Sequence, residues 1–169
     1  MDNKFDNALY GLTTLIECGS KQFKSQGSGF YYNVMSPKDP EVEGGQWRSI
    51  EGTYLITNRH VALPRINECE VIPDYFVFNL REIINNKVEW VPISLNQADL
   101  KQRILLHQNT NVDVVAIKVD DLIIDIIRNN PNRKFIIGGS LSNDNLPSNS
   151  PLNIDVTSDI IVASYPRGF

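Results

Sequence analysis

Seven short runs of β-branched and aromatic residues constrain the fold of this 169-residue chain more than any other feature. Clusters of Gly, Pro, Asn and Asp separate the runs, as is typical of short strands joined by turns. We therefore predict an all-β fold, either an antiparallel barrel or a sandwich. The predicted strands cover residues 12–18, 28–34, 53–58, 75–80, 87–93, 103–107 and 113–119.

Other segments of the chain depart from this strand pattern. Apolar residues recur at helical spacing between Phe5 and Leu12, which predicts a short amphipathic helix before the first strand. The segment 120–132 begins with aspartate and has Pro131 near its end, so a helix is favoured, although its isoleucines also suit a strand. Prolines and a Gly-Gly pair in 35–49 predict a long exposed loop.

Composition and charge narrow the functional classes. Hydrophobic residues make up 41% and charged residues 21% of the chain, which are ordinary values for one globular domain. The net charge is −4 and the basic residues are scattered, so we do not expect a nucleic-acid partner. The first residues lack the pattern of a secretory signal, and no apolar run is long enough for a membrane span, so a cytoplasmic location is expected. Cys18 and Cys69 lack zinc-site spacing, and we expect neither a metal nor an organic cofactor.

Two residues are candidates for proton-transfer chemistry. Hydrolysis of an amide by a weak nucleophile needs an imidazole that takes a proton and a carboxylate that orients the imidazole. His60 follows the predicted strand 53–58, and Asp113 opens the strand 113–119. Taken singly, each residue also suits a structural role, the histidine as a hydrogen-bonded group at a strand end and the aspartate as a turn or strand-end cap.

Four motifs in sequence order make the combination more informative. The chain reads GSGFYY at 27–32, GTYLITNRHVA at 52–62, DVVAIKV at 113–119 and ASYPRGF at 163–169. In these motifs it resembles the trypsin-like serine peptidases, especially the HtrA-like and related bacterial intracellular branch. The resemblance implies a chymotrypsin-like antiparallel β-barrel and a protein or peptide substrate. It also implies that His60 is the general base and Asp113 its orienting acid, and it assigns no role to Arg59.

The chain departs from that family in its nucleophile. No Gly-x-Ser-Gly segment is present, and neither Ser28 nor Ser140, each of which adjoins a glycine, fits the pattern. We therefore expect the catalytic serine to lie beyond residue 169 and the 169 residues alone to be inactive. The expected domains are a first barrel at 1–137, a linker at 138–158 and the start of an incomplete second barrel at 159–169.

Three interpretations of the missing serine stay open. The chain is a portion of a longer serine peptidase, a catalytically inactive barrel that serves as a protein-interaction module, or one part of a split enzyme. The predicted last strand presents unpaired backbone groups, which favours association with further chain. The coding sequence just after codon 169 would separate the first interpretation from the other two.

Overall fold

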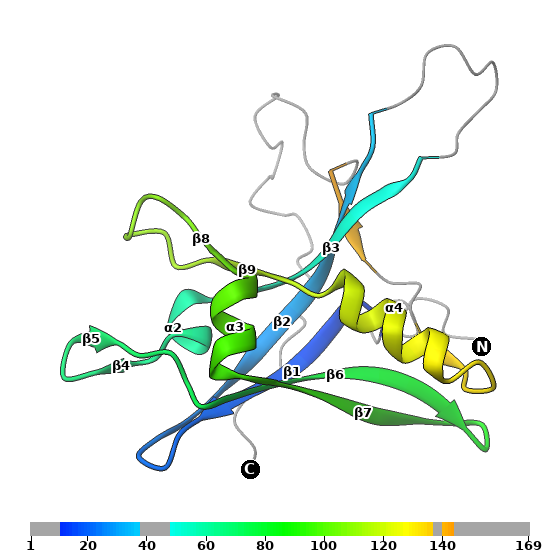
Figure 1. Ribbon diagram of the computed structural model, residues 1–169, viewed down its shortest axis with the longest axis horizontal. Coiled ribbons are helices and arrows are strands. Elements are labelled where there is room, and N and C mark those ends of the chain that lie inside the picture. The colour runs from blue at the N-terminus through cyan, green and yellow to red at the C-terminus, as the bar shows by residue number, and fades with distance from the viewer. Residues whose placement is uncertain (1–10, 38–47, 137–139, 144–169) are drawn as a thin grey trace, which may run out of the picture.

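The computed structural model describes residues 11–37, 48–136 and 140–143, and this part of the chain is mainly antiparallel β-sheet (Figure 1). All seven predicted strands are present, although their bounds differ from the prediction. They are β1 (Thr13–Gly19), β2 (Lys24–Met35), β3 (Ile50–Thr57), β6 (Tyr75–Ile84), β7 (Lys87–Asn96), β8 (Ile104–Leu106) and β9 (Val115–Lys118). The shorter strands are β4 (Arg65–Ile66), β5 (Cys69–Glu70), β10 (Phe135–Ile136) and β11 (Leu141–Ser142).

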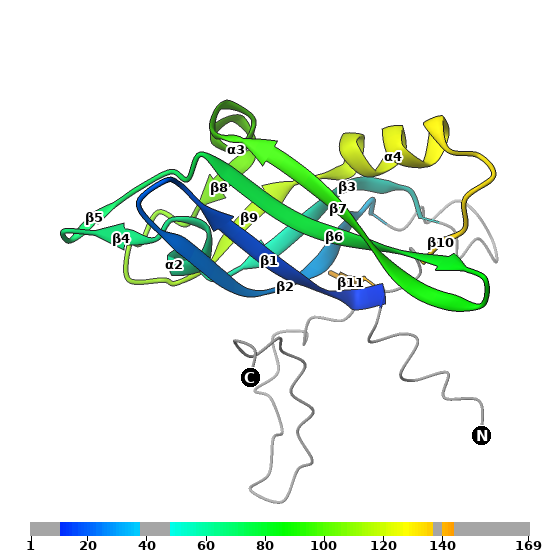
Figure 2. The same cartoon turned by 90° about the horizontal axis from the view of Figure 1, so that it is seen from below.

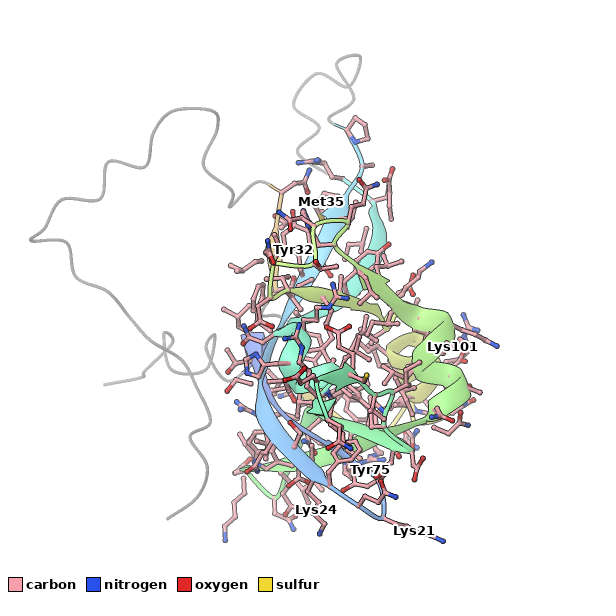
Figure 3. All side chains as sticks on the ribbon, turned by 90° about the vertical axis from the view of Figure 1, so that its left-hand side faces the viewer. Lys21, Lys24, Tyr32, Met35, Tyr75 and Lys101 are labelled. Carbon is pink, nitrogen blue, oxygen red and sulfur yellow. The ribbon has the colours of Figure 1, made fainter. Side chains whose placement is uncertain are left out.

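The long strands form one sheet in the order β10-β6-β1-β2-β3-β9-β8, with β7 paired to β6 and β11 paired to β2. The sheet is strongly twisted and curved (Figure 2). Strand β2 extends along the sheet from Lys24 at one end to Met35 at the other (Figure 3). All pairings are antiparallel except that of β11 with β2. An antiparallel β fold is thus confirmed.

A closed chymotrypsin-like barrel is not seen in the described residues, because helix α3 (Gln97–Arg103) separates β7 from β8 and no ladder joins these two strands. Asn96 begins α3 as an N-cap, since its side-chain oxygen accepts a hydrogen bond from the Asp99 backbone N–H at 2.9 Å. Leu100 on α3 is fully buried in the core. The helix therefore covers part of the core.

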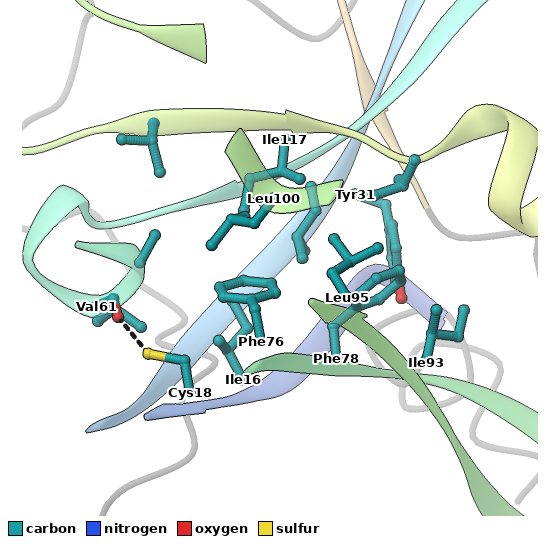
Figure 4. Close-up of a cluster of buried hydrophobic side chains, with 14 of the residues drawn as sticks. Ile16, Cys18, Tyr31, Val61, Phe76, Phe78, Ile93, Leu95, Leu100 and Ile117 are labelled. Atoms are coloured by element: carbon teal, nitrogen blue, oxygen red, sulfur yellow. Dashed lines mark hydrogen bonds between the residues drawn. The ribbon is translucent and has the colours of Figure 1, made fainter. Parts of the chain in front are cut away.

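The core lies on the concave side of the sheet and follows from the alternation of side chains along the strands. In β6, Phe76, Phe78 and Leu80 alternate with less buried residues. Figure 4 shows Phe76 and Phe78 among the side chains of β1, β7 and α3. Tyr31 meets Phe78 edge to face with ring centroids 6.5 Å apart. Burial of each such side chain contributes about 1.5 to 3 kcal/mol.

The predicted helix at 120–132 is confirmed as α4 (Asp120–Asn129). Two aspartates occupy its first turn, where negative charge stabilises a helix, and Pro131 follows its end. Ile123 is buried in the core, and Ile126 and Ile127 pack against the core from the same side of the helix. Three of the isoleucines that left the prediction open thus lie at helical spacing, whereas Ile124 is exposed.

Several predicted features fall partly or wholly outside the described residues. The predicted helix before the first strand lies largely in 1–10, the centre of the predicted loop in 38–47, and the predicted start of a second barrel in 159–169. Within the predicted linker 138–158, residues 140–143 are described, and two of them form β11 beside Tyr32 and Asn33. No helix in the described part of the chain is long and apolar enough to cross a membrane.

Candidate functional site

His60 and Asp113 are in direct contact, although 53 residues separate them in sequence. The ring Nδ1 of His60 lies 2.6 Å from Asp113 Oδ2, and the His60 backbone N–H donates to Asp113 Oδ1 at 3.0 Å. A carboxylate can only accept, so Nδ1 carries the proton of this contact. The other ring nitrogen, Nε2, is then left able to accept a proton when the imidazole is neutral.

The pairing of β3 with β9 brings the two residues together. Thr57 and Val115 lie opposite one another at the end of this antiparallel ladder. His60 follows β3 in helix α2 (Arg59–Ala62), and Asp113 precedes β9. Because neighbouring antiparallel strands run in opposite directions, the residue after one strand and the residue before the other lie at the same edge. The contact is therefore a consequence of strand register.

Asn58 completes the surroundings of the Asp113 carboxylate. Its side-chain N–H group donates to both the backbone oxygen and Oδ2 of Asp113, each at 3.2 Å. Partial burial raises the pKa of Asp113, but the hydrogen bonds from the His60 backbone and ring, the charge of that ring and the Asn58 bond outweigh burial. The pKa of Asp113 is consequently lower than usual, and the carboxylate is charged at neutral pH.

The pair is accessible from solvent, with 67% of the His60 side chain and 49% of the Asp113 side chain exposed. Two surface hollows flank it. The first, of about 400 Å³, is polar and is lined by Arg59, His60, Arg65, Glu70, Thr110, Asn111 and Asp113. The second, of about 450 Å³, lies over β2 and β3 and is lined by residues 26–30 and 56–58 with Thr13, His60, Val61 and Val114. His60 contributes to both hollows.

A row of apolar side chains crosses the outer face of the sheet beside the second hollow. Phe30 on β2 lies opposite Ile56, Ile56 opposite Ala116, and Ala116 opposite Leu105 on β8. Residues that face one another across strands share a face of the sheet. Leu105 is 54% exposed, and Phe30, Ile56 and Ala116 are partly buried. This apolar row is therefore partly exposed on the outer face of the sheet.

The two serines considered as nucleophiles have structural surroundings. Ser28 lies in β2, where its backbone oxygen accepts a hydrogen bond from the Thr57 hydroxyl at 2.8 Å, and it lines the second hollow together with His60. The hydroxyl of Ser140 lies 2.7 Å from the donating Asn33 side-chain nitrogen, next to β11. We assign neither serine to the site. Within the described residues, no group of three or more His, Cys, Asp and Glu side chains could hold a metal ion.

An ion pair beside His60 was not foreseen from the sequence. Arg59 donates from Nε and Nη2 to the two carboxylate oxygens of Glu70 on β5, at 2.7 and 2.8 Å. The pairing lowers the pKa of Glu70 and raises that of Arg59. The two residues are 11 positions apart, and no local sequence pattern links opposite charges at that separation. The sequence therefore held no usable signal for this pair.

Comparisons with known proteins add no relative to this description. No family model matches the chain, and neither the curated proteins nor the solved structures contain a significant match. The resemblance to trypsin-like peptidases therefore depends on the four short motifs alone. Three of these motifs lie around the His60 and Asp113 contact, and the fourth, 163–169, lies outside the described residues.

Proposed function

We propose that this chain carries the general base and the orienting carboxylate of a trypsin-like serine peptidase. The observation that carries the proposal is the contact of His60 Nδ1 with Asp113 Oδ2 at 2.6 Å, with the other carboxylate oxygen held by the His60 backbone N–H. This double attachment fixes both the tautomer and the direction of the imidazole, as base catalysis requires. Four motifs in the order expected for the family support the same assignment.

In the proposed reaction, His60 Nε2 takes the proton of a serine hydroxyl as the serine oxygen bonds to the carbonyl carbon of a peptide. Asp113 stays ionised and stabilises the imidazolium that forms. The imidazolium then gives the proton to the leaving amine as the peptide C–N bond breaks. Water hydrolyses the acyl-enzyme by the same steps, with His60 as the base again. The low pKa of Asp113 suits this role, because the carboxylate must remain charged.

The proposal requires a serine and oxyanion-binding N–H groups from polypeptide outside the described residues. The apolar row of Phe30, Ile56, Ala116 and Leu105 lies beside a hollow that His60 also lines, so chain packed on this row would lie close to the imidazole. We expect the segment that supplies the serine to lie beyond residue 169. Alternatively, another polypeptide supplies it.

The experiment compares the 169 residues with a longer polypeptide that adds any coding sequence found after codon 169. Only the longer polypeptide is expected to react with a fluorophosphonate probe and to cleave a fluorogenic peptide library. Replacement of His60 by alanine should lower its turnover on the order of 10⁴- to 10⁶-fold. His107→Ala is the matched control, because the His107 ring bonds the nearby Asn109 backbone and no other group among the described residues. Turnover that survives His60→Ala would refute the assignment of the base.

One observation favours a second function, that of an inactive protein-interaction module. The apolar row is partly exposed, and exposed apolar surface on a sheet is a common binding surface. On this alternative the longer polypeptide neither reacts with the probe nor cleaves peptides, and Leu105→Glu abolishes binding of a protein partner. Probe labelling of the longer polypeptide at a serine would exclude it.

A further inference from the structure

Helix α2, which carries His60, is too short to hold its own orientation. It has four residues, and isolated helices of this length are unstable in water. Asn58 occupies the N-cap position but makes no capping hydrogen bond, since its side chain bonds Asp113 instead. The direction of the His60 ring must therefore be set by contacts between α2 and other elements.

Besides the bonds of His60 to Asp113, three contacts tie α2 to its surroundings. Val61 and Ala62 are buried against the core, and the Cys18 thiol of β1 donates to the Val61 backbone oxygen at 3.1 Å (Figure 4). These contacts hold the side of α2 that faces the sheet. The third contact is the Arg59–Glu70 pair, which ties the residue next to His60 to β5 on the outer side.

The Arg59–Glu70 pair is bidentate, since two guanidinium nitrogens bond the two carboxylate oxygens. A bidentate guanidinium–carboxylate pair fixes orientation as well as distance. The Arg59 side chain is only 11% exposed and that of Glu70 27% exposed, so the pair is better shielded from solvent than a typical surface ion pair. Arg59 Nη1 is buried without an acceptor in the described part of the chain, which makes Glu70 the main compensation for its charge.

Glu70 is itself fixed in place by the β4–β5 hairpin. Arg65 pairs with Glu70 across the hairpin, and the Val71 N–H donates to the Pro64 backbone oxygen at 3.0 Å. The turn between the strands has positive φ angles at Asn67 and Glu68, 50° and 66°. The Arg65 guanidinium lies 3.9 Å from Glu70 and is mainly solvated, so Arg59 is the dominant partner of the carboxylate.

We propose that Arg59 and Glu70 are a positioning pair, which holds α2 so that both the backbone N–H and the ring of His60 reach the Asp113 carboxylate. Neither residue touches the reacting atoms of the proposed reaction. Their effect passes through the α2 backbone, because Arg59 and His60 are consecutive residues of one helical turn. The pair also forms one wall of the polar hollow beside His60.

The proposal can be tested by NMR on the 169-residue chain. The chain has two histidines, so the His60 ring signals are readily assigned, with those of His107 as an internal reference. In Glu70→Gln, the downfield Nδ1–H signal of His60 should be lost or broadened. Hydrogen exchange at the His60 amide should accelerate about tenfold relative to the β6 amides. The pKa of Asp113 should rise toward that of an ordinary carboxyl group, since its hydrogen bonds from His60 weaken.

Asp121→Asn is the matched control, because Arg103 and Asp121 form another bidentate pair on α3 and α4. This variant should leave the His60 signals and the Asp113 pKa unchanged. Arg59→Lys is the conservative variant, which keeps the charge but loses the bidentate geometry, and it should give an intermediate effect. It replaces Glu70→Gln in the test if Glu70→Gln does not fold. Unchanged His60 signals in a folded Glu70→Gln or Arg59→Lys protein would overturn the proposal, as would equal changes in Asp121→Asn.

The positioning role would serve catalysis only if the proposed peptidase function holds, but the NMR measurements need no catalysis. If the protein is an active peptidase and its His60 signals do not change in Glu70→Gln, the positioning role is refuted and the proposed function stands. If the protein is inactive and Glu70→Gln disrupts the contact of His60 with Asp113, the proposed function is refuted and the positioning role stands. The two proposals can therefore fail separately.

Discussion

The close approach of Gly27 to helix α2 gives a prediction whose size follows from the structure. A Cβ atom added at Gly27 would lie 2.6 and 2.8 Å from the two γ-carbons of Val61 and 3.3 Å from its Cβ. Ordinary carbon contacts are about 3.5 to 4 Å. Gly27 is held in the β1–β2 ladder opposite Ile16, whereas α2 is a single turn, so α2 is the element that must move. The required displacement is about 1 Å.

Overpacking of this kind costs about 1 to 3 kcal/mol, so Gly27→Ala should lower the free energy of unfolding by that amount. The Tm should fall by about 2 to 4 °C for each kcal/mol. Val61→Ala removes both clashing γ-carbons and should cost about 2 kcal/mol by itself through lost burial. In the double variant the two γ-carbon clashes are absent and only the 3.3 Å approach to the Val61 Cβ remains, so its destabilisation should be smaller than the sum of the two single effects by about 1 to 2 kcal/mol.

Urea unfolding of the four proteins in this double-mutant cycle measures the coupling directly. Gly52→Ala is the control, because the three atoms nearest to its added Cβ would all belong to the Tyr54 side chain, the closest at 3.1 Å, and the free energy of unfolding should change by less than about 1 kcal/mol. If the Gly27 and Val61 effects add within about 0.5 kcal/mol, the contact between β2 and α2 is not the reason for the glycine.

Three further predictions concern stability. Leu100→Ala should lower the free energy of unfolding by about 2 to 5 kcal/mol, since the side chain is fully buried in the core; a loss below about 1 kcal/mol in urea unfolding would show that α3 does not fill the core. Because the folded pKa of Asp113 is depressed, its stabilising contribution is present above the unfolded carboxyl pKa of about 4 and is lost as pH falls through the lower folded value. Asp113→Asn should therefore destabilise at pH 7 and flatten the pH dependence below about pH 4, and an unchanged pH profile would contradict this. Asp121→Asn should cost less than about 1 kcal/mol, because half of that side chain is exposed, and the loss should shrink at 1 M salt; a salt-independent loss would contradict a screened ion pair.

The strands could be predicted from the sequence because their apolar alternation is strong, but their ends could not. β6 was expected to stop at residue 80 and continues to Ile84. Arg81 and Glu82 end the apolar pattern, yet both are buried, Glu82 in a bidentate pair with Arg133. Because the partner of Glu82 lies 51 positions away, the residues around Glu82 give no sign of the pair, and a charged residue there is predicted to be solvent-exposed.

The missed helices differ in the signal they offered. α3 begins with an asparagine N-cap and an aspartate three residues later, a pattern that predicts a helix start and could have been recognised. α2 offered only the asparagine at its N-cap position, because four residues are too few to show helical periodicity. The contact of His60 with Asp113 was expected only through the family resemblance, since no local pattern indicates which aspartate meets a given histidine.

The position of the His60–Asp113 contact in the sheet also sets when it can form during folding. The β1–β2 and β6–β7 ladders join neighbouring stretches through short turns, whereas the β3–β9 ladder must close a loop between Thr57 and Val115. Closure of long loops is the slower and entropically costlier event. We therefore expect a refolding chain to acquire its hairpins first and its imidazole–carboxylate pair among the last contacts, so that the pair appears only in molecules that have completed the sheet.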